Sequence, residues 1–188
     1  MTRFIATVCA ALTLLVTSVV RAENAFHHSR TIVVLHSGIK LTNSEKLEFH
    51  FSPTALVSYL GVNWSVTKWF GLHFYGGWAF NTDEPLVSIM VNPHFEKFWM
   101  WGEIDGLFPS LRGYYFLQAE YEFFDWLNAG IEGEGWGSYD GTSPWSHGAG
   151  VNILLELGKM VRVDLALQGR DLEEDFKPEF QLRVHLAL

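Results

Sequence analysis

The sequence of 188 residues contains a single cysteine, Cys9, which lies inside an apolar stretch at the N-terminus. A chain processed after this stretch keeps no cysteine, and only packing and hydrogen bonding stabilise it. Basic residues are also scarce, with 13 Lys and Arg against 21 Asp and Glu. This acidic balance argues against nucleic acid as a partner.

Catalytic motifs and long apolar runs are missing after the N-terminal stretch. No segment beyond residue 22 is apolar for long enough to form a membrane-spanning helix. The sequence has no P-loop, no paired cysteines, no HExxH motif and no dinucleotide fingerprint. We therefore predict no cofactor, no metal and no catalytic residue.

Residues 1–22 have the features of a secretory signal peptide. Arg3 precedes an apolar stretch over Phe4–Val20, and Ala22 provides a small residue at the cleavage point. The alternative is an uncleaved anchor, since the stretch approaches the length that spans a bilayer. Cleavage leaves residues 23–188 as one domain with 11 basic and 21 acidic residues, a formal net charge of −10.

The segment Tyr114–Trp136 shows the pattern that recurs along the mature chain. Every second residue is apolar over Tyr115–Phe123 and again over Leu127–Ile131. Strand side chains alternate between two faces, so this segment is predicted to be a hairpin with one apolar and one acidic face. The acidic face carries Glu120, Glu122, Glu132 and Glu134.

The same period predicts an all-β chain of ten antiparallel strands in an up-and-down barrel, with both chain ends on one side. Eight or twelve strands are alternatives, because the segment 42–54 alternates but is interrupted by Pro53. The predicted strands are 30–41, 55–66, 70–80, 86–95, 97–105, 112–123, 126–136, 148–157, 160–169 and 179–188.

Turn lengths and aromatic residues give a second signal. Tight turns alternate with longer polar connections such as 138–147 and 170–179, as the two ends of transmembrane barrels do. Aromatic residues cluster at the tight turns, and such residues favour the interface between headgroups and hydrocarbon. The predicted aromatic girdle comprises Trp69, Phe95, Trp99, Phe124 and Trp126.

Together with the leader and an alternating C-terminal strand, these features resemble those of small bacterial outer-membrane β-barrel proteins. The resemblance implies a Gram-negative outer membrane, contact with lipopolysaccharide and phospholipid, and recognition of the last strand by the barrel-assembly machinery. That class usually ends in an aromatic residue, whereas this chain ends in Leu188.

Two orientations of the barrel satisfy the alternation. A soluble periplasmic ligand-binding barrel would turn the apolar face inward, and a membrane barrel would turn it outward. The polar face is rich in Gly, Asn, Gln and opposite charges. Such a composition suits a crowded barrel interior in which opposite charges form ion pairs. The predicted lumen network comprises Glu120, Glu122, Glu132, Glu134, Glu156, Asp164, Arg162, Arg183, His73, His94 and His185.

The leading interpretation is a non-enzymatic outer-membrane barrel with a structural, adhesion or minor cation-permeability role. The enzymatic alternative modifies lipid A or phospholipid at the membrane interface through a Ser with a His and an acidic partner. Ser146-His147 with Asp140, and Ser88 with His94, are its two candidate arrangements. Adjacent strand residues point to opposite faces, which weakens the Ser146-His147 candidate.

Overall fold

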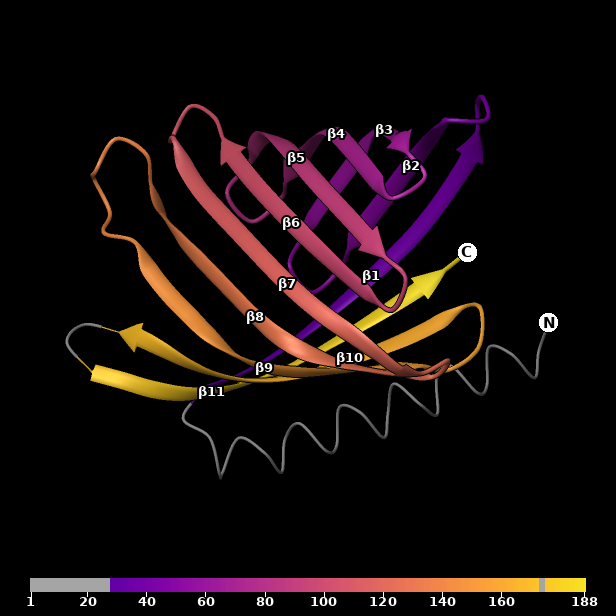
Figure 1. The fold of residues 1–188 in the computed structure, drawn as a ribbon. Helices are drawn as coiled ribbons and strands as arrows, with labels where there is room; N and C mark the ends of the chain where they lie inside the picture. Colours follow the sequence, from indigo (N-terminus) through magenta and orange to yellow (C-terminus); the bar gives the residue numbers. More distant parts are fainter. Residues whose placement is uncertain (1–27, 173–174) are drawn as a thin grey trace, which may run out of the picture.

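The computed structural model describes residues 28–172 and 175–188, so the predicted signal peptide over residues 1–22 lies outside the described residues. The described chain forms a closed barrel of eleven strands (Figure 1). They are β1 (His28–Lys40), β2 (Glu45–Ser52), β3 (Val57–Thr67), β4 (Phe70–Ala79), β5 (Glu84–Phe95), β6 (Phe98–Leu107), β7 (Arg112–Phe124), β8 (Leu127–Ser138), β9 (Ser146–Glu156), β10 (Val161–Leu172) and β11 (Asp175–Ala187).

The prediction of an all-β barrel is confirmed, but the predicted count of ten strands is wrong. The additional strand is β2, within the segment 42–54 that the pattern left ambiguous. Its residues pair with β1 on one side and β3 on the other. Pro53 does not interrupt β2, because it follows the last strand residue, where no ladder N–H is needed.

The odd strand count makes the closing pair parallel. β1 pairs with β11 from His28 opposite Glu179 to His36 opposite Ala187. The other neighbouring strands are antiparallel. The first strand therefore begins, and the last strand finishes, on opposite sides of the barrel, whereas the ten-strand prediction put them on one side. β1 begins at the loop end of the barrel, where the connection 139–145 lies, and β11 finishes at the turn end, with the tight turns 68–69, 96–97 and 125–126 (Figure 1).

One predicted loop is largely strand. The polar stretch 170–179 continues the ladder between β10 and β11, with Arg170 opposite Lys177 and Leu172 opposite Asp175. A polar segment can form strand here because its inward side chains meet other polar groups instead of an apolar core.

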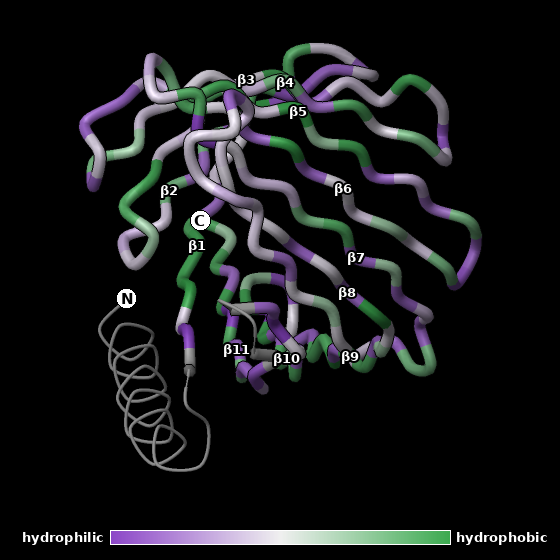
Figure 2. The backbone as a smooth tube through the Cα atoms, turned by 90° about the vertical axis from the view of Figure 1, so that its left-hand side faces the viewer, coloured by the Kyte–Doolittle hydropathy of each residue, from purple (hydrophilic) through white to green (hydrophobic). Residues whose placement is uncertain are grey.

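Side-chain alternation places apolar residues outside and polar residues inside. The exposed fractions of Ile131, Ile104 and Val151 are 64%, 60% and 59%, whereas Glu120 and Glu134 are fully buried. Hydrophobic and hydrophilic residues accordingly alternate along the strands in Figure 2. Val163, Leu182 and Val184 form a hydrophobic cluster on β10 and β11, on the opposite strand faces from Asp164 and Arg183. The exposed apolar faces are the reverse of what an ordinary soluble barrel shows.

Inward-facing glycines allow the strands to coil closely. A Cβ on Gly130 would overlap the carbonyl oxygen of Ala119 and lie 2.8 Å from the Cα of Glu120. Gly76 is the contrasting case, since a Cβ there meets no atom within 4 Å. The two positions therefore separate the effect of close strand approach from the general effect of replacing glycine in a strand.

Replacing Gly130 with Ala should destabilise the barrel, because β7 and β8 must separate to admit the methyl group. Forced overpacking of this kind costs about 1–3 kcal/mol. Gly76→Ala is the matched control and should leave stability unchanged or raise it slightly. Urea unfolding of the two purified variants measures the difference. Equal effects would show that β7 and β8 do not approach each other this closely.

Candidate functional site

The candidate site is the polar interior formed by β7, β8, β10, β11 and the start of β1. Register aligns its inward residues in rows across neighbouring strands: Gln118 lies opposite Glu132, and Gln168 lies opposite Glu179. Glycines on β9 provide the space that these side chains fill. A Cβ on Gly148 would lie 2.9 Å from Nη2 of Arg170.

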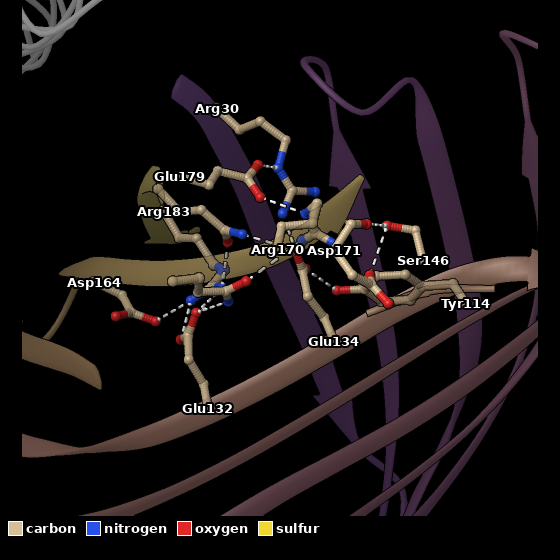
Figure 3. A network of polar contacts seen from close by, with 12 residues as sticks. Arg30, Tyr114, Glu132, Glu134, Ser146, Asp164, Arg170, Asp171, Glu179 and Arg183 are labelled. Carbon is tan, nitrogen blue, oxygen red and sulfur yellow. Dashed lines mark hydrogen bonds and ion pairs between the residues drawn. The ribbon is translucent and has the colours of Figure 1, made fainter. Parts of the chain in front are cut away.

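Arg183 is the centre of the first ion-pair group (Figure 3). Its Nη1 and Nη2 each donate to one carboxylate oxygen of Glu132 at 2.6 Å, and Nη1 also donates to Asp164 Oδ2 at 2.7 Å. The guanidinium carbon lies 4.7 Å from the ring centroid of Phe116. Bidentate geometry makes the Arg183–Glu132 contact one of the stronger kinds of ion pair. Through Glu132 and Asp164, Arg183 on β11 is joined to β8 and β10.

Arg30 and Arg170 form the second group, nearer the loop end. Both guanidiniums contact the carboxylates of Glu134 and Glu179, with Arg170 Nε 2.5 Å from Glu179 Oε2. Their guanidinium carbons lie 4.9 and 3.8 Å, respectively, from the ring centroid of Trp136, which adds cation–π attraction. This group crosses the parallel seam between β1 and β11.

A third group lies around Glu48 on β2. Its Oε2 accepts a hydrogen bond from the Tyr75 hydroxyl at 2.6 Å and lies 3.5 Å from His73 Nδ1, and its Oε1 lies 2.9 Å from Lys46 Nζ. His185 is placed separately, with Nδ1 3.0 Å from His36 Nε2 across the closing seam.

The structure therefore brings together only part of the predicted network. Glu132, Glu134, Asp164 and Arg183 meet in the arginine groups, and Glu120 accepts hydrogen bonds from the amides of Gln118 and Asn152. Arg30, Arg170 and Glu179 complete these groups but were missed. Glu179 and Arg30 begin predicted strands, and Arg170 begins a predicted loop. The signal that could have found Arg170 is its spacing, since it continues the inward row of Asp164, Ala166 and Gln168.

The remaining predicted members lie near the turn end, outside the arginine groups. His94 is exposed, with Nε2 2.6 Å from the carbonyl oxygen of Glu96. Glu156 pairs with Arg162 at 3.5 Å, and the Arg162 side chain is 58% exposed. Glu122 is half-buried near the end of β7. Strand ends near a rim remain open to solvent, so these residues have little need of a buried partner.

Four of the five residues predicted to form an aromatic girdle lie on the outer surface of the barrel. Trp69 stacks on Phe95 with ring centroids 5.2 Å apart, and Phe124 stacks on Trp126 at 5.8 Å. All four side chains are exposed. Trp99 instead shares the strand face of Trp101 and Asp105, and Trp101 packs against buried His73. Trp99 therefore belongs to the inward row of β6.

Neither predicted Ser and His arrangement forms a catalytic pair. Ser146 Oγ donates to the carbonyl oxygen of Asp171 at 2.9 Å, whereas His147 Nδ1 lies 2.8 Å from the Tyr115 hydroxyl. Ser88 lies opposite Asp105 in the interior, far along β5 from exposed His94. Over residues 28–172 and 175–188, no three His, Cys, Asp or Glu side chains come together to hold a metal ion.

The fold and interior define the chain as a closed β-barrel with an ion-paired interior and an apolar outer surface. Comparison with models of known protein families finds no match, and comparison with curated proteins also finds none. In the described part of the chain, no helix is long and apolar enough to cross a membrane.

Removing one member of the Arg183 group should lower the free energy of unfolding far more than removing one member of the exposed Glu156–Arg162 pair. Glu132→Gln leaves a buried guanidinium with weakened compensation, a defect that costs about 3–5 kcal/mol. Glu156→Gln breaks only an exposed pair and should cost about 0–1 kcal/mol. Urea unfolding of both variants tests the contrast, and similar losses would argue against the buried pair as a stabilising element.

Proposed function

We propose that this chain spans the outer membrane of a Gram-negative bacterium as a non-enzymatic β-barrel with a structural, adhesion or minor cation-permeability role. The observation that carries the proposal is the inverted distribution of side chains. Apolar residues dominate the exposed positions of the strands, and ionised groups are buried in the interior. A monomer in water rarely exposes contiguous apolar surface on this scale.

Lipid is the partner that matches this surface. Ile131 and Val151 lie directly opposite each other on β8 and β9, and Ile104 lies on nearby β6; each is at least 59% exposed. The stacked Trp69–Phe95 and Phe124–Trp126 pairs occupy the turn end, where an interfacial belt in contact with lipopolysaccharide or phospholipid headgroups would lie. In this proposal the barrel-assembly machinery recognises β11, whose alternation of Phe180, Leu182, Val184 and Leu186 extends to its end.

Cell fractionation followed by SDS gels with and without boiling tests membrane insertion. The proposal expects the chain in the outer-membrane fraction and a band whose migration changes on heating. Recovery in the aqueous phase after osmotic shock, without detergent, would favour the soluble ligand-binding alternative. Mass spectrometry of lipid A and phospholipid from cells with and without the protein tests the enzymatic alternative, and a changed lipid would overturn the non-enzymatic proposal.

Introducing an arginine on the outer surface reports directly on lipid contact. Val151→Arg should cost about 2–4 kcal/mol if the side chain faces hydrocarbon near the bilayer centre. Val151→Leu is the control for the change of size and should cost little. Unfolding of protein reconstituted in vesicles provides the measurement. A cost near zero for the arginine variant would place Val151 in water.

Ion conduction should be small, because the interior is filled by paired side chains. Glu120, Glu134 and Gln181 are fully buried, so little water reaches that level of the barrel. Any conductance should favour cations, since carboxylates outnumber arginines in the interior groups. Recordings in planar bilayers measure both properties. Large or anion-selective steps would contradict the minor cation-permeability role.

A further inference from the structure

The interior beside β5 and β6 differs from the arginine groups in its charge. Glu103 and Asp105 are alternate residues on the inward face of β6, close enough for each carboxyl to act on the charge of the other. In the described part of the chain, no Lys or Arg lies within ion-pair distance of either carboxylate. By contrast, Arg183 directly neutralises Glu132 and Asp164.

Two buried oxygens at this place lack partners. Asp105 is 5% exposed, and its Oδ2 accepts a hydrogen bond from the Tyr59 hydroxyl at 2.9 Å, but its Oδ1 has no hydrogen-bond partner. Ser88 is the residue directly opposite on β5, and its Oγ is 1% exposed; it lies near the Asp105 carboxyl but makes no hydrogen bond of normal geometry. Such groups are expensive to bury unless something compensates them.

We propose that Glu103, Asp105 and Ser88 form a binding site for a hard divalent cation, for which Ca²⁺ is the probe. Carboxylate and hydroxyl oxygens are the donors that such ions prefer, and water completes a shell that has few protein ligands. A bound cation supplies the missing positive charge and partners for Asp105 Oδ1 and Ser88 Oγ. The site depends only on the barrel interior, so it is independent of the proposed membrane location.

Calcium binding to the folded full-length protein tests the site directly. Equilibrium binding of radioactive Ca²⁺ in detergent should give one ion per chain, with binding lost in Asp105→Asn and weakened in Ser88→Ala. Glu122→Gln is the matched control, because it removes a carboxylate from the inward row of β7 and should leave binding intact. Absence of binding to the unmodified protein, or binding that both site variants retain, would overturn the proposal.

Thermal resistance in SDS gives a second test, in which EDTA and CaCl₂ should have opposite effects on the difference between the unmodified protein and Asp105→Asn. In EDTA, Asp105→Asn should be more heat-resistant than the unmodified protein, because it removes repulsion between two uncompensated carboxylates. In CaCl₂ the unmodified protein should gain several degrees by linkage and the variant should gain none. A pair that shares a proton without binding metal would show no calcium-dependent gain, which would contradict the proposal.

Discussion

Compensation of buried charge is the constraint on which the rest of this barrel depends. Arg183 holds Glu132 and Asp164 together, and Arg30 and Arg170 hold Glu134 and Glu179. Desolvating these groups is costly, and a partner in good geometry offsets the cost only when every member is in place. Because side chains alternate with a period of two, a one-residue slip of β8 or β11 would turn the paired groups outward. The ion pairs therefore stabilise the register as well as the fold.

The same constraint bears on the unusual closing seam. Parallel ladders are slightly less stable per residue than antiparallel ones, and β1 meets β11 in parallel. Side chains supplement the backbone bonds at this seam. Arg30 pairs with Glu179 near the start of the seam. Near the end of the seam, His36 Nε2 lies 3.0 Å from His185 Nδ1. Since Arg30 and Arg170 also share Glu134, closure of the barrel is coupled to the ion pair that joins β8 to β10 across β9. The parallel seam is thus part of the interior network.

Much of this arrangement could be predicted from local alternation, because a period of two identifies strands and their faces without knowledge of neighbours. The ten predicted segments all lie within or overlap strands. Prediction failed where local pattern and three-dimensional context differ. β2 was missed because it is short and adjoins Pro53, and Arg170 was assigned to a loop because polar residues ordinarily end strands. The pairing of Arg183 on β11 with Glu132 on β8 depends on barrel curvature, which brings non-neighbouring strands into contact, and no sequence spacing encodes it.

The filled interior also bears on which of the proposed roles the molecule favours. Because ion pairs occupy the lumen, the proposed adhesion role would place partner contact at the ends of the barrel. Side-chain hydrogen bonds hold part of the loop 139–145 in place. Tyr139 donates to the carbonyl oxygen of Asp105 at 3.0 Å, and hydrogen bonds from Ser138 and Thr142 lower the pKa of Asp140 to about 2. Asp140 consequently stays ionised, and keeps these bonds, at neutral pH. A loop fixed before contact loses less conformational entropy on binding, so this loop supports the adhesion role within the proposal made above.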